Sequence, residues 1–381
     1  MRFLGALLLA LHGIAHLVGF RAAFWPAAGQ AGSVQLLNRF VFAGDVAAKA
    51  LGVVWLLVAV AYLLAAVLWL GRESSWTAVA LAASTVSLLM CGLAWPDARI
   101  GVGIDLLLLL VAFLMSRSSS GHLESAFRGE LRLASLPIEI GHQEPIDEQA
   151  IASLPEPVRR YLRFMGVVGR PRDWSMRARF KAHFRRAPGE WVTCEALQYD
   201  SRLKLSRIFY MQLALKNVLP VTVRDTYLDG RGRMRAKAFD LIKVVDGEGP
   251  ELDVGELVTY LNDAILMAPS LLLGPEASWK AVDAQSFDVT LTDGPHRVTA
   301  RVWLDERGAP RDFSTTDRFF DQPDGKRVRT EWRTPVSGWQ LVDGRSLPTR
   351  AEAVWQLPTG PFSYADFSVD PSLIAFNVAP L

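Results

Sequence analysis

Two long runs with almost no charge, both in the first third of the chain, set the strongest limit on how it can fold. Val46–Leu70 contains a single charged residue, Lys49, and Trp76–Trp95 contains none. At about 1.5 Å per residue, a helix over either run is long enough to cross a hydrocarbon core of roughly 30 Å. The two runs therefore predict membrane-spanning helices.

Two shorter apolar runs flank this pair. Phe3–Phe20 contains two histidines, and Ile100–Met115 contains one acidic residue. We expect a transmembrane domain over residues 1–117, with four helices at about 3–20, 46–70, 76–95 and 100–115. Phe3–Phe20 also has the apolar core of a cleaved signal peptide, but no small-residue cleavage site follows it, so we favour a retained helix.

Four spans would place both ends of the chain on one side of the membrane. The positive residues on that side are Arg2, Arg72, Arg117, Arg128 and Arg132, and those on the other side are Arg21, Arg39, Lys49 and Arg99. Short loops rich in positive charge stay in the cytoplasm. We therefore expect a multi-pass protein of the plasma (inner) membrane. The side with the chain ends has slightly more positive residues than the other side, which slightly favours a cytoplasmic soluble domain.

Polar residues inside the predicted helices form a second pattern. His16 lies about 6 Å before the end of the first helix, and Asp105 lies about 7.5 Å after the start of the fourth, on the same side of the membrane. Asp45 and Lys49, spaced i,i+4, begin the second helix on that side. We expect one polar cluster of His12, His16, Asp45, Lys49 and Asp105 near this membrane face.

Such a cluster has three interpretations. Its hydrogen bonds can lock the bundle, it can handle protons or a ligand, or the His-x3-His pair can hold a metal or haem. We favour the structural lock and expect neither a metal nor another cofactor.

The rest of the chain has a different composition. Residues 1–120 hold 7 Lys/Arg and 4 Asp/Glu, whereas residues 121–381 hold 34 and 35. This nearly neutral balance gives no basic surface, so we exclude nucleic-acid binding. The stretch 118–150 contains Ser, Gly and charge, with amphipathic character around Leu123–Leu133, and predicts a tether ahead of a soluble domain over residues 151–381.

From Trp174 the apolar residues recur with a period of two, as in a strand with one buried face. Further strands separated by turn pairs such as Asp229-Gly230 and Asp293-Gly294 predict consecutive hairpins, and therefore an antiparallel sheet. Val254–Leu273 is the exception, because its apolar residues have helical spacing. We expect an α+β soluble domain built on a large curved antiparallel sheet of about nine to eleven strands, a half-barrel capped by this helix.

Four separated stretches, LPEPVRRYLRFMG (154–166), GELVTYLNDAILMAPSLLLG (255–274), RVWLDERGAPRDFS (301–314) and WQLPTGPFSYADFS (355–368), occur in this order. Together they resemble a family of uncharacterised bacterial proteins defined only as a domain of unknown function. Members similar to this chain also carry an N-terminal four-helix membrane region, here LHGIAHLVGF (11–20) and WPDARIGVGIDLLLLL (95–110). The resemblance implies this arrangement and no activity. The sheet pattern is also similar, more distantly, to the half-barrel of bacterial lipoprotein carriers and related lipid-binding proteins.

The soluble part contains no GxSxG, HExxH, CxxC or phosphate-binding glycine loop. The GRG at 230–232 follows Asp229 in a predicted turn, where glycine supplies a positive φ. Glu256 and Asp263 lie two turns apart on the capping helix and could form a carboxylate site. Glu256 is also near the helix start, where a negative charge stabilises the helix dipole. We therefore assign no catalytic residue.

Aromatic residues are more informative about function than the acidic residues. In a large curved sheet they fill the core or line a pocket for an apolar ligand. The ligand-binding candidates are Trp174, Trp191, Tyr210, Trp279, Trp303, Trp355, Glu256 and Asp263.

These observations favour a membrane-anchored, non-enzymatic protein that binds a lipid-like or other apolar ligand in the concave face of its sheet. Its partners would be membrane lipid and that small ligand. One alternative is an enzyme, of hydrolytic type, with a carboxylate site formed by Glu256 or Asp263 in the same concavity. The other is a transport or redox bundle centred on His12, His16 and Asp105.

Overall fold

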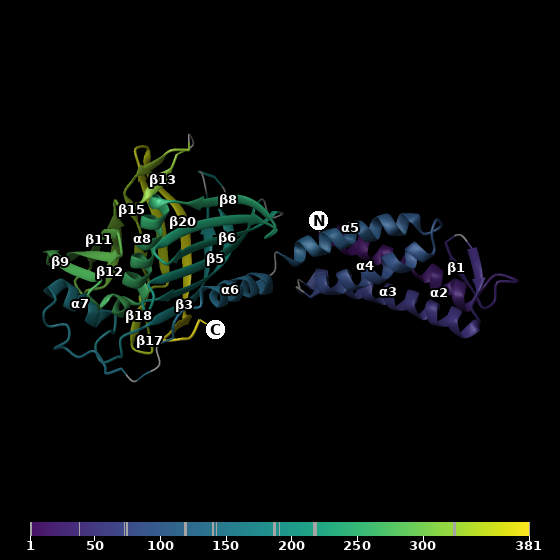
Figure 1. Cartoon of the computed structure of the whole chain (residues 1–381), viewed down its shortest axis with the longest axis horizontal. Coiled ribbons are helices and arrows are strands. Elements are labelled where there is room, and N and C mark those ends of the chain that lie inside the picture. Colours follow the sequence, from purple (N-terminus) through teal and green to yellow (C-terminus); the bar gives the residue numbers. More distant parts are fainter. Residues whose placement is uncertain are drawn as a thin grey trace. The chain divides into compact units, whose positions relative to one another are not determined.

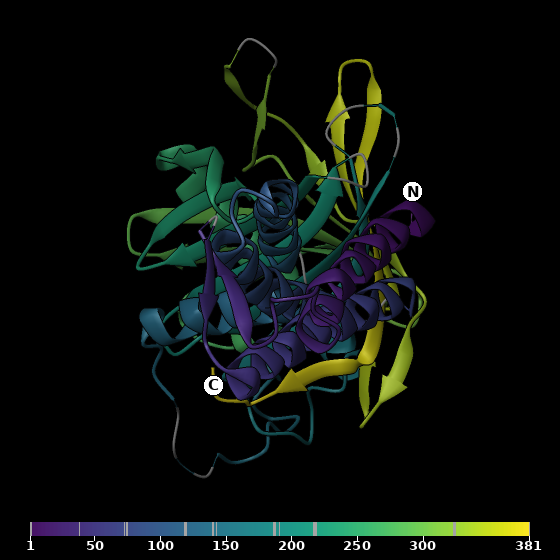
Figure 2. The same ribbon diagram turned by 90° about the vertical axis from the view of Figure 1, so that its right-hand side faces the viewer.

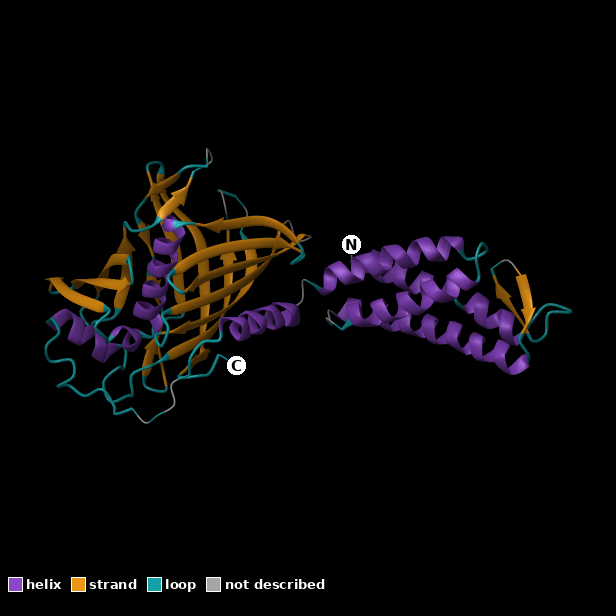
Figure 3. Ribbon diagram, viewed as in Figure 1, coloured by secondary structure: helices purple, strands orange, loops and turns teal. Residues whose placement is uncertain are grey.

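The computed structural model describes residues 2–37, 39–71, 73, 75–117, 120–138, 141, 143–185, 188–189, 191–215, 219–322 and 325–380. Internal contacts divide the chain into two units, Met1–Ser119 and Ser120–Leu381. Figures 1 and 3 show that the first unit is mainly helical and that the second is built around a sheet.

The first unit is a helical bundle. Its elements are α1 (Arg2–Ala15), α2 (Leu17–Phe24), β1 (Ser33–Leu36), β2 (Arg39–Phe42), α3 (Asp45–Gly71), α4 (Trp76–Leu93) and α5 (Arg99–Ser116). Four stretches of described helix are long and apolar enough to cross a membrane: Phe3–Phe24, Asp45–Gly71, Trp76–Leu93 and Arg99–Ser116. The predicted four-helix arrangement is confirmed, and the first stretch is interrupted at His16, between α1 and α2.

Glycines bring α1 and α2 close to α3. A Cβ atom on Gly13 would lie 2.9 Å from the Cβ of Tyr62, and one on Gly19 would lie 2.5 Å from the Trp55 ring. Small residues allow such close approach between membrane helices. As a result, His12 faces the Tyr62 ring at 4.8 Å between centroids, inside the bundle.

The second unit contains a 14-stranded antiparallel sheet. Along the hydrogen-bonded order its strands are β8 (Ile242–Glu248), β7 (Arg231–Ala238), β6 (Leu219–Leu228), β5 (Ser206–Leu215), β4 (Val192–Ser201), β3 (Ser175–Phe184), β20 (Gly360–Phe376), β19 (Arg350–Leu357), β15 (Trp332–Arg333), β12 (Pro310–Thr315), β11 (His296–Leu304), β10 (Ser286–Asp293) and β9 (Ala277–Asp283), while β16 (Val336–Ser337) pairs with β19. The short ribbons β13 (Phe319–Asp321) with β14 (Arg327–Arg329) and β17 (Gln340–Val342) with β18 (Arg345–Leu347) complete the strands.

The first strand of this sheet, β3, pairs with the last, β20, so both lie at its centre. Figure 2 shows β20 and its hairpin partner β19 in yellow. The helices of the second unit are α6 (Ser120–Ala134), α7 (Glu156–Phe164) and α8 (Pro250–Met267), followed by the 3-10 helix η1 (Pro269–Leu272).

The two faces of the sheet carry different helices. α8 lies on the concave side, where most of its residues are buried in the main hydrophobic core (Figure 1). α6 covers the opposite face through Leu123, Phe127 and Leu131, which contact β4 and β5. The predicted half-barrel with a capping helix is therefore confirmed. The segment expected as a tether contributes α6 to the second unit, because its i,i+4 apolar stripe is buried on the sheet.

Two details differ from the sequence expectations. The sheet has 14 strands instead of nine to eleven. The strands β7 and β8 are separated by a turn that the sequence analysis did not predict, in which Phe239 and Asp240 adopt φ values of 52° and 53°. No glycine marks this turn, and Asp240 is hydrogen bonded to His122 of α6 at 2.8 Å.

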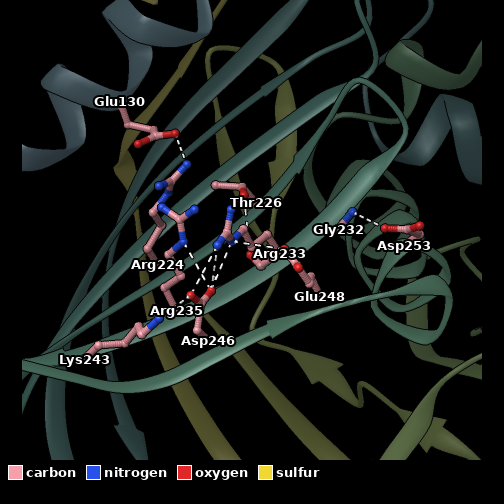
Figure 4. Close-up of polar contacts among 10 residues, drawn as sticks. All are labelled: Glu130, Arg224, Thr226, Gly232, Arg233, Arg235, Lys243, Asp246, Glu248 and Asp253. Atoms are coloured by element: carbon pink, nitrogen blue, oxygen red, sulfur yellow. Dashed lines mark hydrogen bonds and ion pairs between the residues drawn. The ribbon is translucent and has the colours of Figure 1, made fainter.

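Ion pairs link the edge strand β8 to its neighbour β7 (Figure 4). Asp246 lies 3.0 Å from both Arg233 and Lys243, and hydrogen bonds from these two partners lower the pKa of Asp246 to about 2. The Asp253 carboxylate in the first turn of α8 accepts a hydrogen bond from the backbone N–H of Gly232 at 2.7 Å. These contacts fix the start of α8 against the edge of the sheet.

Candidate functional site

The concave face of the sheet changes from apolar to polar along strands β4, β5 and β6. Near one end its inward side chains are apolar, as at Ala196, Met211 and Val221. Toward the other end the same period of two places polar residues inward: Gln198 and Asp200 on β4, Arg207 on β5 and Asp225 on β6. The polar half of the concave face lies against α8.

Arg207 is the centre of a buried ionic cluster between the sheet and α8. Its Nε donates to Oδ2 of Asp263 at 2.7 Å, and its Nη1 donates to Oε2 of Glu256 at 3.2 Å. Asp225 lies 3.6 Å from the same guanidinium, and Gln198 donates to Asp263 at 2.8 Å. Arg207, Glu256 and Asp263 are 4%, 2% and 9% exposed, so this cluster is almost closed to solvent.

Burial raises the pKa of the carboxyl groups in this cluster. The pKa of Asp200 rises by desolvation and by the nearby charge of Asp263, and that of Glu256 rises by desolvation and by the charge of Asp225. Desolvation also raises the pKa of Asp263, against the opposing effect of Arg207. The cluster therefore keeps protons at pH values where exposed carboxyl groups have lost them.

A second arginine, Arg318, lies on an aromatic wall in the same interior. Its Cζ is 4.4 Å from the ring centroid of Trp332 and 5.7 Å from that of Trp355. Trp332 Nε1 donates to the hydroxyl of Tyr364 at 3.1 Å, and the Tyr364 ring stacks on Trp355. The charge of Arg318 opposes the upward pKa shifts of Glu256 and Asp263, so its electrostatic effect reaches the Arg207 cluster. We refer to Arg318, Trp332, Trp355 and Tyr364 as the Arg318 site.

The Arg318 site has two hydrogen-bond donors without acceptors. Among the residues that the structure describes, the Arg318 guanidinium makes no hydrogen bond or ion pair, and the Tyr364 hydroxyl donates its hydrogen to no group. Both side chains are partly exposed. A guanidinium and a phenol on one aromatic surface are suited to the oxygens of an anion, with apolar area beside them.

The structure brings Trp355, Glu256 and Asp263 together in this interior and leaves the other predicted ligand-binding residues elsewhere. Tyr210 lies on the outer face beneath α6, hydrogen bonded to Glu130. Trp279 packs against Phe287, and Trp303 donates to Ser314. Trp174 and Trp191 flank β3 and β4 and are partly exposed.

A separate cleft of about 200 Å³ opens beside the end of α8, lined by residues that include Arg202, Tyr260, Leu271, Leu272, Glu276 and Asp293. None of the six predicted aromatic residues lines it. It is smaller than the 300–1,000 Å³ or so of most ligand pockets. The concave face, where the sequence predicted an apolar ligand, is largely occupied over the described residues by α8 and the core around it.

The first unit contains its own buried polar cluster. His12 Nε2 lies 2.7 Å from Oδ1 of Asp105, whose Oδ2 accepts a hydrogen bond from Ser87 at 2.6 Å. Ser87 Oγ is also 2.6 Å from Nε2 of His16, and Tyr62 donates to Asp105 Oδ1 at 2.8 Å. All five side chains are buried.

This cluster includes some predicted residues and omits others. The structure brings His12, His16 and Asp105 within 4.8 Å of one another, measured between potential ligand atoms. Asp45 and Lys49 are exposed in the first turns of α3 and do not join it among the described contacts. Tyr62 and Ser87 were missed, although each is a polar residue inside an uncharged run, which is the signal that could have identified them.

Comparison with known proteins gives the family of this half-barrel protein. Residues 144–367, more than half of the chain, match a family of unknown function, DUF6544. The chain belongs to this family, which confirms the resemblance seen in the sequence. Among curated proteins, none matches the chain.

Three solved structures are similar to this chain. A LolA superfamily protein from Nitrosomonas europaea has 12% identity and a TM-score of 0.26, over 56% of this chain and 90% of that chain. A DUF1329 family protein from Desulfovibrio piger has 12% identity and a TM-score of 0.30, over 58% and 90%. A β-barrel-like protein of the domain of unknown function DUF1849 from Brucella abortus has 10% identity and a TM-score of 0.20, over 54% and 98%.

Proposed function

We propose that this protein is a membrane-anchored, non-enzymatic binding protein for an anionic amphiphile, whose head group binds at the Arg318 site. The observation that carries the proposal is the pair of donors without acceptors, Arg318 and Tyr364, on the aromatic wall of the concave interior. The four apolar helices support anchoring in the plasma membrane, with the cytoplasmic side favoured by the distribution of arginine.

The chemistry of the Arg318 site selects for negative charge. A hydrogen bond to a charged group contributes about 1.5–3 kcal/mol, and Arg318 offers several such donors in one plane. Trp332 and Trp355 are 3% and 8% exposed and hold the guanidinium in place from within the core. Arg207 donates hydrogen bonds to Glu256 and Asp263 and so offsets the negative charge that would otherwise repel an anion.

The carboxylates of the interior support binding more than catalysis. Glu256 and Asp263 are held by Arg207 and are nearly closed to solvent, whereas a catalytic carboxylate has to contact its substrate. The more accessible groups at this location are the two partly exposed donors of the Arg318 site, and these recognise an anion without transferring a proton to it.

Ligand selectivity tests the proposal directly. The full-length chain in a non-ionic detergent is titrated with a long-chain fatty acid and with the fatty alcohol of the same length, and bound molecules are counted by native mass spectrometry. We expect the acid to bind about tenfold more tightly, since one charge-assisted hydrogen bond is worth at least about 1.4 kcal/mol. In Arg318→Met the two affinities should become nearly equal.

Arg329→Met is the matched control. Arg329 also lies over an aromatic ring, that of Phe319 at 5.6 Å, but its side chain is 58% exposed and pairs with Asp317. This variant should keep the preference for the acid. Equal binding of acid and alcohol by the unmodified chain, or equal effects of the two substitutions, would show that the Arg318 site does not select the ligand.

A further inference from the structure

The hydrogens of the buried cluster in the first unit can be counted from its geometry. Ser87 Oγ lies 2.6 Å from Nε2 of His16 and 2.6 Å from Oδ2 of Asp105. A serine hydroxyl carries one hydrogen, so it can donate to only one of these two neighbours. The other contact needs a hydrogen from His16 or from Asp105.

The tautomer of His16 is fixed by a backbone group. Its Nδ1 lies 2.8 Å from the carbonyl oxygen of His12, which can only accept, so Nδ1 carries a hydrogen. Nε2 of a neutral His16 is then a bare acceptor. With neutral His16 and ionised Asp105, one of the two 2.6 Å contacts of Ser87 would set lone pair against lone pair.

One additional proton satisfies both contacts, in either of two arrangements. In the first, His16 is an imidazolium that donates to Ser87, and Ser87 donates to the Asp105 carboxylate. In the second, Asp105 is protonated at Oδ2 and donates to Ser87, which donates to neutral His16. Moving from the first to the second breaks Nε2–H, forms a new Oγ–H, breaks the old Oγ–H and forms Oδ2–H.

We propose that His16, Ser87 and Asp105 form a proton-binding relay within the membrane-spanning bundle. Its three members are 3%, 0% and 0% exposed, in helices that are otherwise apolar. With the shared proton bound, His16 and Asp105 together carry no net charge in either arrangement, which a low-dielectric environment tolerates better than a lone carboxylate. The relay is independent of ligand binding in the second unit.

The other titratable side chains near the relay come from the neighbouring helices. His12 on α1 and Tyr62 on α3 both contact Oδ1 of Asp105, so they stabilise the carboxylate end. Cys91 on α4 lies 3.9 Å from Ser87 Oγ. Arg21 on α2 and Lys49 on α3 are exposed and lie outside the cluster. Hydrogen bonds from His12 and Tyr62 thus surround Asp105 without supplying the missing proton between Ser87 and its two partners.

Histidine NMR of the full-length chain in lipid nanodiscs tests the relay. Nitrogen chemical shifts report the protonation of each imidazole across a pH titration, and His16→Asn identifies the His16 signal. We expect Ser87→Ala to reduce the proton affinity of His16 at least about tenfold, a shift of one pH unit or more in its midpoint. Ser87→Thr restores the hydroxyl and should return the midpoint to that of the unmodified chain.

Ser84→Ala is the matched control, because Ser84 lies on the same helix and bonds to Tyr62 at 2.9 Å instead of to His16. It should leave the His16 titration unchanged. Asp105→Asn provides a second variant, which keeps the side-chain shape and should make His16 neutral near pH 7. Equal titrations in Ser87→Ala and Ser84→Ala, or an imidazolium that persists in Asp105→Asn, would overturn the relay. So would one bound metal ion per chain in elemental analysis of the purified protein.

Discussion

Removing the guanidinium of Arg207 is the most demanding test of the buried ionic cluster. Arg207→Met keeps much of the apolar stem and leaves Asp263 and Glu256 without their positive partner, at 9% and 2% exposure. Breaking one side of a buried ion pair typically costs 3–5 kcal/mol, roughly, because the remaining charge stays desolvated. We expect a loss in this range in the free energy of unfolding at pH 7.

The loss should depend on pH, and its sign follows from proton binding. Without Arg207, the pKa values of Glu256 and Asp263 in the folded state rise further above those of the unfolded chain. At pH values between the unfolded-state and folded-state pKa, the folded state then holds more protons than the unfolded state. The free energy of unfolding therefore falls as pH rises. Each additional proton held contributes about 1.4 kcal/mol per pH unit, and the loss should therefore be smallest near pH 4.

Hydrogen–deuterium exchange with mass spectrometry measures this effect locally. The exchange rates of peptides from β4, β5 and β6 give the free energy of opening of the sheet around Arg207 in the full-length protein. Arg301→Met is the control, because Arg301 forms a bidentate ion pair with Asp288 but its side chain is 39% exposed. It should cost about 0–1 kcal/mol. If the two variants lose equal stability, or if the Arg207→Met loss does not change with pH, the Arg207 cluster does not act as a buried ionic network.

Two further substitutions test other parts of the second unit. Asp200 is buried and its pKa is raised, so its contribution to the free energy of unfolding is present below the unfolded pKa of about 4 and is lost as pH rises. Asp200→Asn should therefore be more stable than the unmodified chain at pH 7. In the same exchange experiment its stability should fall less steeply with pH. A Cβ on Gly232 would overlap the backbone carbonyl at the start of α8, so Gly232→Ala should lower the thermal unfolding temperature, at a cost of roughly 1–3 kcal/mol. A Cβ on Gly255 in α8 would meet no atom within 4 Å, so Gly255→Ala should be neutral or stabilising.

The architecture could be predicted from the sequence where a local pattern decides the structure. The apolar runs predict four helices, because a helix needs about this length to cross a hydrocarbon core. Asp229-Gly230 gives a hairpin, and these residues adopt φ values of 54° and 70°. The turn at Phe239 and Asp240 was missed because Phe rarely adopts a positive φ and no glycine adjoins this pair. A contact with α6, which is remote in sequence, supports the turn.

The site was less predictable, because both faces of β4 and β5 are covered. Tyr210 is buried under α6 while its neighbour Phe209 faces the concave core, so apolar residues occupy both phases of the period of two. Alternation then cannot show which aromatic residues face inward. Arg318 lies between β12 and β13, where no period exists to place it.

The interior arginines differ in how they are paired, and from this we expect different roles for them. Arg207 has three acidic partners, and Arg345 makes two hydrogen bonds to Asp173, so these guanidinium groups are compensated within the fold. Arg318 pairs with neither Glu256 nor Asp263 among the described contacts, and rests instead on Trp332 and Trp355. A group that added mainly to stability would be paired as the other two are. The same change to methionine should therefore cost stability at Arg207 and ligand selectivity at Arg318, which is the division of roles that the interior of this half-barrel implies.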